Sequence, residues 1–232
     1  MMRLGLWLVC FTLLLAACTP AADSGQLAYI GQDGNVYLTD LQTTTQLTDD
    51  ATAAAELNGR SYHRLAWSVD GWLAAAAVQR AGDGAQSELL AFPPDQTDEP
   101  LSLGSSDSNF VIYNYWSPRA CGFGCQRLAY LSEEPAGVAL RLVDIDEGVV
   151  SNDRLGQGWP FYFGWSPEGE GMLWHRGGPA WVGENGRFQA GDFVQYDLFA
   201  RETIKTWQPG EFVAPVWLDG FRWVGVKAQN GQ

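Results

Sequence analysis

Short runs of apolar residues alternate with polar turn sequences along most of the chain, and the pattern repeats with a period of about fifty residues. Four runs share a tryptophan followed by turn residues: LAWSVDG at 65–71, NYWSPRA at 114–120, FGWSPEG at 163–169 and PVWLDG at 215–220. Spacings of 49, 49 and 52 residues separate the four tryptophans, Trp67, Trp116, Trp165 and Trp217. Because proline presets a turn and glycine closes it, each run predicts a strand that ends in a hairpin.

The segments after each turn repeat as well. A second apolar strand is predicted at 72–78, 127–132, 171–175 and 221–226, and QLAYIG at 26–31 matches RLAYLS two periods later. A third strand ends in Asp and an apolar residue at 36–41, 140–145 and 194–198. A short fourth strand is predicted at 46–48 and 202–207, and no helical period of any length is present.

This pattern predicts an all-β protein, a β-propeller of four-stranded blades with about four to five repeats. A single sheet of this kind has two apolar faces, and radial stacking of successive sheets covers both while the strand edges stay short. The tryptophans would then fill the wedges between blades. A β-sandwich is the alternative, but it does not require tryptophans at a fixed phase.

The repeat count leaves open whether the ring closes. One period before Trp67 falls on Cys18, so the first sheet lacks a Trp-bearing inner strand, and the last repeat has two strands. The strand around Trp217 would complete the first sheet and close a four-bladed ring, with 221–226 left over. The other interpretation is an incomplete ring, formed by a truncated chain or by a chain that needs a partner.

The N-terminus has the pattern of an export signal. Arg3 precedes an apolar run of 14 residues, Leu4–Ala17, whereas a membrane-spanning helix needs about 20. The run ends in Leu15-Ala16-Ala17-Cys18, which resembles the bacterial lipobox, and this resemblance implies cleavage before Cys18 and its lipidation. An ordinary secretory peptide is the alternative.

The predicted domains follow from this boundary: a lipoprotein signal peptide at 1–17, a lipidated tether at 18–25 and the propeller at 26–232. The resemblance to lipoproteins implies a protein of the bacterial cell envelope. Its lipid would hold it on the outer side of the cytoplasmic membrane or in the outer membrane.

The charge of the chain restricts its partners. Lys and Arg number 14 against 27 Asp and Glu, a formal net charge of −13. Such a chain repels phosphate backbones, so nucleic acid is excluded as a partner.

Two cysteines lie beyond the N-terminal segment, Cys121 and Cys125 in the sequence CGFGC. An exported chain enters an oxidising compartment, which predicts a disulfide between them. A metal site is disfavoured because zinc takes four ligands and neither histidine is near in sequence. A free pair of thiols is the remaining alternative.

The sequence contains no recognised catalytic motif. The nucleophile elbow G-x-S-x-G and the zinc motif H-E-x-x-H are both absent, and Gly164–Gly169 is better explained as a blade turn. Paired carboxylates such as Asp144 and Asp146 are interpreted as solvated turn residues. We therefore predict no catalytic residue, no metal and no cofactor.

One group of side chains is a candidate ligand face. The segments that lead into each inner strand gather at one mouth of a propeller channel, and they are rich in aromatic residues. A peptide or a sugar would suit such a rim, and the alternative is that the rings pack between blades. The candidate residues are Tyr62, His63, Arg64, Tyr113, Tyr115, Trp159 and Tyr162.

The Trp-turn segments are similar to the propeller repeats of the periplasmic protein TolB and of dipeptidyl-peptidase-like enzymes. Residues Trp67–Gly71, Trp116–Pro118, Trp165–Gly169 and Trp217–Gly220 carry the resemblance, which covers about residues 26 to 228. No copy has the full WSPDG sequence, and one copy replaces its turn with the cysteine loop. Unlike in TolB, the sequence predicts no helical domain before the propeller.

The resemblance identifies blades but fits unrelated activities. The predicted function is a membrane-tethered, non-enzymatic lipoprotein that binds a protein, peptide or glycan in the cell envelope. The alternative is the propeller of a dipeptidyl-peptidase-like or other hydrolase, or a part of one. The missing nucleophile elbow favours the first of these.

Overall fold

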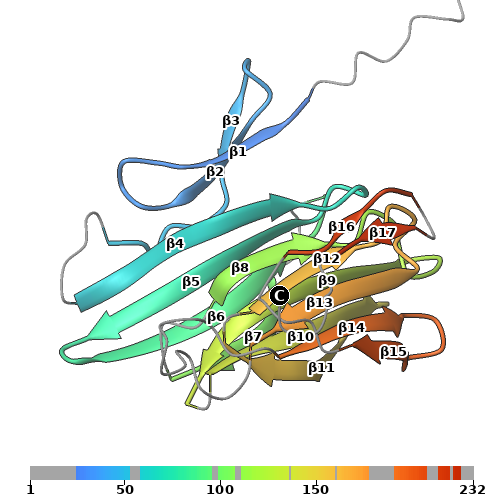
Figure 1. The fold of residues 1–232 in the computed structure, drawn as a ribbon. Helices are drawn as coiled ribbons and strands as arrows, with labels where there is room; N and C mark the ends of the chain where they lie inside the picture. The colour runs from blue at the N-terminus through green and yellow to red at the C-terminus, as the bar shows by residue number, and fades with distance from the viewer. Residues whose placement is uncertain are drawn as a thin grey trace, which may run out of the picture.

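The computed structural model describes residues 25–52, 58–95, 99–107, 111–135, 137–159, 161–177, 191–207, 214–219 and 222–225. Every regular element in this part of the chain is a β-strand, which confirms the predicted all-β fold (Figure 1). None of the described residues forms a helix long and apolar enough to cross a membrane. The predicted signal peptide, Cys18 and most of the tether lie outside the described residues.

Five antiparallel sheets follow one another in chain order, each with its strands in sequential order. The first has three strands, β1 (Leu27–Ile30), β2 (Val36–Thr39) and β3 (Thr44–Gln46). The second has four, β4 (Asn58–Trp67), β5 (Leu73–Ala81), β6 (Gly84–Phe92) and β7 (Leu101–Ser106). The third has β8 (Val111–Trp116), β9 (Cys125–Glu134), β10 (Gly137–Asp146) and β11 (Val149–Gly158).

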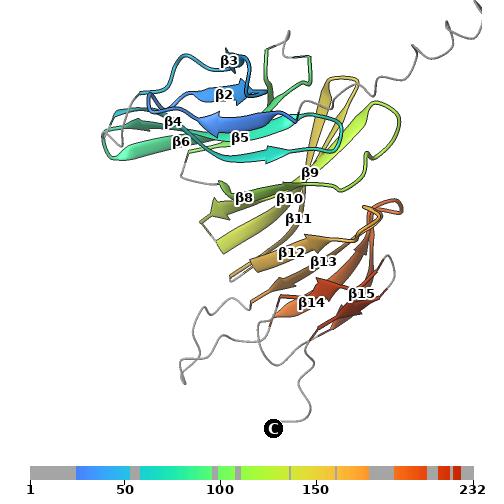
Figure 2. The same ribbon diagram turned by 90° about the horizontal axis from the view of Figure 1, so that it is seen from above.

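The fourth sheet also has four strands, β12 (Phe161–Trp165), β13 (Gly171–Arg176), β14 (Asp192–Asp197) and β15 (Glu202–Trp207). The fifth pairs β16 (Val216–Trp217) with β17 (Trp223–Val224). Figure 2 shows the first four sheets as a fan, as the blades of a propeller are arranged. The inner strands of the successive repeats are β4, β8, β12 and β16.

The hydrophobic core is divided into layers that lie between successive sheets. Three buried clusters fill the spaces between the first and second, second and third, and third and fourth sheets. The run of four alanines in β5 lies between two of these layers. Ala74 and Ala76 belong to the layer on one face, whereas Ala75 and Ala77 belong to the layer on the other. Small side chains therefore let two neighbouring sheets approach β5 closely.

The tryptophan phase has a direct structural cause. In the second, third and fourth of these tryptophans, the indole N–H donates to the backbone carbonyl of the residue just before the tryptophan of the preceding repeat. Trp116 donates to Ala66 at 2.9 Å, Trp165 to Tyr115 at 3.1 Å and Trp217 to Gly164 at 3.4 Å. The ring therefore fills the space between two inner strands, and its polar atom is satisfied there. We call this series of contacts the tryptophan array.

A serine holds the turns that follow Trp67 and Trp165. The Ser68 hydroxyl accepts from the Trp72 amide at 2.9 Å, and the Ser166 hydroxyl accepts from the Gly171 amide at 3.0 Å. Gly71 and Gly169 both have positive φ, 82° and 69°, which favours glycine at the position where the motif has it.

In the third sheet the same turn is replaced by the cysteine loop. The structure contains the predicted disulfide between Cys121 and Cys125, whose Cα atoms are 5.2 Å apart. The Cys121 amide also donates to the Cys125 carbonyl at 3.2 Å, so the loop closes as a compact extension of the hairpin.

Candidate functional site

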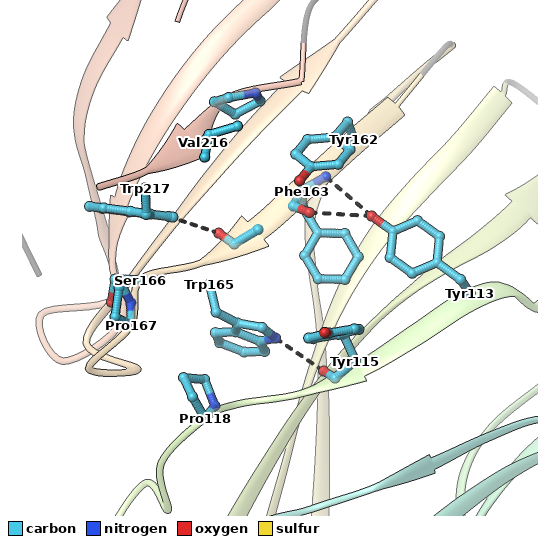
Figure 3. Close-up of a pocket in the computed structure, with 12 residues that line it drawn as sticks. Tyr113, Tyr115, Pro118, Tyr162, Phe163, Trp165, Ser166, Pro167, Val216 and Trp217 are labelled. Carbon is cyan, nitrogen blue, oxygen red and sulfur yellow. Dashed lines mark hydrogen bonds between the residues drawn. The ribbon is translucent and has the colours of Figure 1, made fainter. Parts of the chain in front are cut away.

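A cavity of about 540 Å³ opens beside the inner strands β8, β12 and β16 (Figure 3). Aromatic rings and prolines make up most of its wall. We call it the inner-strand pocket, and it is lined by Tyr113, Tyr115, Pro118, Tyr162, Phe163, Gly164, Trp165, Ser166, Pro167, Pro215, Val216 and Trp217.

One wall of the pocket is a rigid stack between two repeats. The rings of Tyr113 on β8 and Phe163 on β12 are nearly parallel, with centroids 5.0 Å apart. The Tyr113 hydroxyl donates to the Phe163 carbonyl at 3.3 Å and accepts from the Phe163 amide at 3.4 Å. Burial raises the pKa of Tyr113 above its ordinary value, so this phenol stays neutral. The stack holds the two inner strands in fixed positions.

Two tryptophans of the array also line the pocket. The indole N–H groups of Trp165 and Trp217 are already committed to the carbonyls of Tyr115 and Gly164. A ligand would therefore meet their rings and not their polar atoms. The side chain of Trp165 is 8% exposed, which makes it a fixed part of the wall.

Tyr115 is the most exposed aromatic residue of the pocket, and Tyr113, Tyr162 and Trp217 are less exposed. Tyr115 is 63% exposed, and Tyr162 is half-buried. The exposure of Tyr115 follows from the alternation of side chains along β8, because Tyr115 and Trp116 point to opposite faces of the strand. Trp116 fills the layer toward the second sheet, so Tyr115 is left on the side of the pocket.

The pocket has no charged lining residue. Its twelve residues include no carboxylate, imidazole, ammonium or guanidinium group. General acid–base catalysis and nucleophilic activation both need a titratable group close to the substrate, and this wall supplies only phenols and one serine. Among the residues that the structure describes, no cluster of His, Cys, Asp or Glu is arranged to hold a metal ion.

The structure brings three of the predicted ligand-face residues together. Tyr113, Tyr115 and Tyr162 line the inner-strand pocket. Trp159, 38% exposed, lies just after β11 and does not line it, and His63 and Arg64 on β4 do not line it either.

Tyr62 lies in the core and not on a ligand face. It is 6% exposed and packs between the first and second sheets. Its hydroxyl donates to Asp50 at 2.7 Å and accepts from Arg60 at 3.0 Å. Burial, the largest cause, raises the pKa of Tyr62 to about 12. The structure therefore supports the alternative interpretation for Tyr62, namely that its ring packs between blades.

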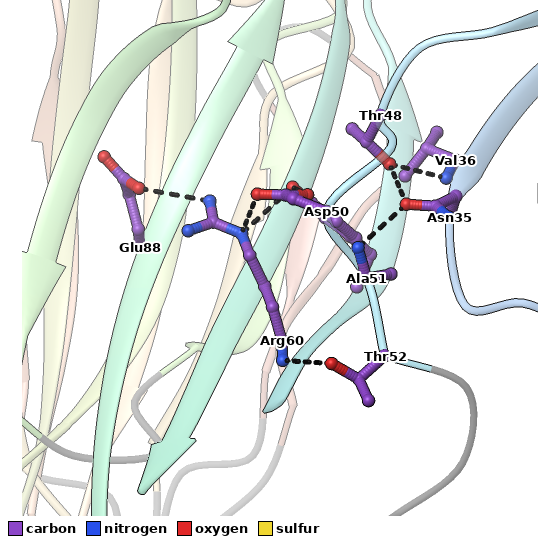
Figure 4. Close-up of polar contacts among 9 residues, drawn as sticks. Asn35, Val36, Thr48, Asp50, Ala51, Thr52, Arg60 and Glu88 are labelled. Atoms are coloured by element: carbon purple, nitrogen blue, oxygen red, sulfur yellow. Dashed lines mark hydrogen bonds and ion pairs between the residues drawn. The ribbon is translucent and has the colours of Figure 1, made fainter. Parts of the chain in front are cut away.

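The contacts around Tyr62 attach the first sheet to the second (Figure 4). Arg60 lies between Asp50, at 3.2 Å, and Glu88, at 3.4 Å. On the other side, the Asn35 side-chain oxygen accepts from the Thr48 hydroxyl at 3.1 Å and the Ala51 amide at 3.0 Å. The segment that joins β3 to β4 is therefore held by side chains from both sheets.

A β-bulge explains why His63 and Arg64 do not occupy the same place as the tyrosines of the next two repeats. The pairing of β4 with β5 shifts between His63 and Ala66, and Arg64 has a positive φ of 59°. A bulge re-aims the side chains on either side of it. Burial, with the charges of Arg64 and Arg80, lowers the pKa of His63.

The prolines and the valine of the pocket wall are not among the predicted ligand-face residues. Pro118 and Pro167 fall in predicted hairpin turns, and Pro215 and Val216 fall in a predicted inner strand. They reach the pocket because the turn of one repeat lies next to the inner strand of the following repeat. The repeated Trp-Ser-Pro sequence was the available signal for this wall.

The likeness of this chain to known proteins lies in the fold. No protein-family model matches it, and no curated protein matches it by sequence. Among solved structures, the chain is similar to the WD40 domain of SCAP from fission yeast, with 10% sequence identity and a TM-score of 0.41. The match covers 82% of this chain and 40% of that chain, so this chain spans less than half the length of its neighbour.

Proposed function

We propose that this chain is a non-catalytic, membrane-anchored interaction module that binds an extended apolar peptide segment of a partner protein. The observation that carries the proposal is the inner-strand pocket, where aromatic rings from successive repeats form one continuous wall. Concave, mostly apolar pockets with a few polar groups are the usual form of a ligand site.

The lining favours a peptide over a glycan. Sugar hydroxyls need several fixed polar partners, since a buried polar group left without one costs free energy. The pocket has no amide or charged side chain, and its indoles are already committed to backbone carbonyls. Exposed tyrosines instead offer flat apolar surface together with one hydroxyl each, which suits apolar side chains and peptide carbonyls.

The pocket can be tested with the double variant Tyr115→Ala/Tyr162→Ala. Peptides selected by the wild-type chain from a random phage-displayed library would be titrated by fluorescence anisotropy. Because truncation of interface aromatics commonly costs more than 1 kcal/mol each, we expect affinity to fall by about tenfold or more.

The matched control is Phe199→Ala, which removes a ring that is 97% exposed and lies outside the pocket. It should leave the affinity unchanged. If the folded double variant binds the selected peptides as tightly as the wild type, the pocket is not the peptide site.

The membrane anchor is part of the proposal and rests on the sequence. Leu15-Ala16-Ala17-Cys18 resembles the lipobox, and the repeats resemble TolB-like propellers of the cell envelope. A net charge of −13 favours a neutral or basic partner, and it disfavours adsorption of the protein body to anionic lipid. Attachment would therefore depend on the acyl chains.

Cys18→Ala is expected to release the protein from the membrane or leave it as an unprocessed precursor. Acyl chains contribute about 0.8 kcal/mol for each buried CH₂ group, so the difference in partitioning should be large. Membrane fractionation and intact-mass measurement would show it. A variant that fractionates with the membrane and has the processed, lipidated mass would contradict the anchor.

A further inference from the structure

At the first end of the tryptophan array, no carbonyl of the described part of the chain accepts from the indole N–H of Trp67. Trp116 is 4% exposed and Trp165 is 8% exposed, because each ring lies against the inner strand of the preceding repeat. Trp67 holds the same place in its repeat and is 36% exposed. Among the described residues, the first sheet contains no inner strand that would cover this ring and accept from its indole.

The strands of the first sheet can be matched to those of a complete sheet. In the third sheet, Leu128 of β9 pairs with Val143 of β10, and Asp144 follows. In the first sheet, Leu27 of β1 pairs with Thr39 of β2, and Asp40 follows. Strands β1, β2 and β3 therefore correspond to the second, third and fourth strands of a blade. The missing inner strand would therefore lie along the edge of β1 that does not pair with β2.

At the other end of the array, no indole among the described residues donates to the carbonyl of Val216. Strand β16 behaves as an inner strand, since Trp217 makes the array contact with Gly164. Val216 precedes Trp217 and so holds the position of Ala66, Tyr115 and Gly164, whose carbonyls accept the indoles of the other repeats. Its pairing with β17 extends over two residue pairs in the described part of the chain.

We propose that β16 of a second copy of this chain completes the first sheet. The partner's β16 would pair antiparallel with β1, and Trp67 would donate its indole N–H to the carbonyl of the partner's Val216. The short pairing of β16 with β17 would give way to this one. The contact repeats the interface already present at three places in the array, so its geometry needs no new element.

The register of the new pairing follows from the complete sheets. The residue before the tryptophan pairs with Ala74 in the second sheet, Ala129 in the third and Leu173 in the fourth. Ala28 holds this position in β1, because Leu27 corresponds to Leu128 and Ala28 to Ala129. Ala28 is therefore expected opposite the partner's Val216.

Ring closure argues for two copies. Figure 2 shows the first and fourth sheets at opposite ends of the fan. Strand β16 lies beside the fourth sheet, so it does not reach the first sheet of its own chain. Each copy would contribute three complete sheets and one shared sheet, and two copies make eight, which lies within the range of about four to eight blades. Contacts between unlike ends close into a ring when the rotation allows it.

The surface at this end suits burial in spite of the acidic charge of the chain. Leu27, Ile30 and Trp67 are 55%, 40% and 36% exposed, so the strand edge carries apolar area. Because both copies are acidic, added salt should screen their repulsion and favour the pairing.

The test uses full-length chains in detergent, one copy carrying Ala28→Cys and a differently tagged copy carrying Val216→Cys. Mild oxidation should join the two by a disulfide, since directly opposed residues of antiparallel strands face each other. Leu27→Cys mixed with Val216→Cys is the control, because a shift of one residue places the two side chains on opposite faces. The unsubstituted chain should have the mass of two chains by native mass spectrometry after removal of detergent.

Equal crosslinking in the control, or a single-chain mass together with no crosslink, would overturn the proposal. A disulfide formed within one chain that carries both cysteines at high dilution would also overturn it and would show a four-bladed ring. These outcomes are independent of the peptide-binding measurement, so failure of one proposal can be told from failure of the other.

Discussion

Trp116→Ala is expected to lower the free energy of unfolding by about 3–5 kcal/mol. Trp116 is 4% exposed and belongs to the buried layer between the second and third sheets. Its removal would leave a cavity there and would leave the Ala66 carbonyl without the indole donor that now lies at 2.9 Å. Urea denaturation followed by circular dichroism would measure the change.

The variant Trp116→Phe separates the two contributions, because it keeps most of the ring and removes the N–H. We expect it to cost clearly less than Trp116→Ala. Phe199→Ala, at a residue that is 97% exposed, should change stability by no more than about 0.5 kcal/mol. A loss below 1 kcal/mol for Trp116→Ala would contradict the role given to the tryptophan array.

Asp144→Ala is expected to lower the free energy of unfolding by about 3–5 kcal/mol, because it leaves a buried cation without its partner. The Arg127 guanidinium holds both carboxylate oxygens of Asp144, with Nη2 and Oδ2 2.8 Å apart. The two side chains are 12% and 13% exposed, so water cannot replace the lost contact well. Thermal and urea unfolding would give the magnitude.

Glu170→Ala provides the contrast within the same fold. Glu170 pairs with Arg119 at 3.6 Å, and their side chains are 67% and 62% exposed. Exposed pairs contribute about 0–1 kcal/mol, so this variant should unfold almost as the wild type does. Replacing both members of the buried pair, as Arg127→Met/Asp144→Leu, should recover much of the stability lost in Asp144→Ala. Equal effects of Glu170→Ala and Asp144→Ala would contradict this account.

Outer strands were the part of the blades that the sequence pattern showed least well. Strands β7 and β11 were not predicted, whereas most inner and middle strands were. The reason is burial: β11 has no buried residue, whereas six of the ten residues of β9 and six of the ten residues of β10 are buried. A strand that pairs by one edge and faces solvent needs no apolar alternation, and so it leaves little trace in the sequence.

The repeat, the turns and the disulfide could be inferred from the sequence alone because each depends on residues close together or at a fixed phase. Tryptophans recur because every junction between blades has the same shape to fill. Serine and glycine recur because they satisfy the amides and the positive φ of one turn. Cys121 and Cys125 are four residues apart, so their pairing needs no distant contact.

The identity of the pocket residues depended on the tertiary structure. Tyr62 lies five residues before Trp67, and Tyr113 lies three residues before Trp116. Tyr62 is buried against Asp50 and Arg60, whereas Tyr113 stacks on Phe163 of the next repeat. The bulge in β4 and the neighbouring sheet on each side decide which face a ring occupies. A one-residue shift in register turns a side chain to the opposite face, and no local pattern in the sequence records where that shift occurs.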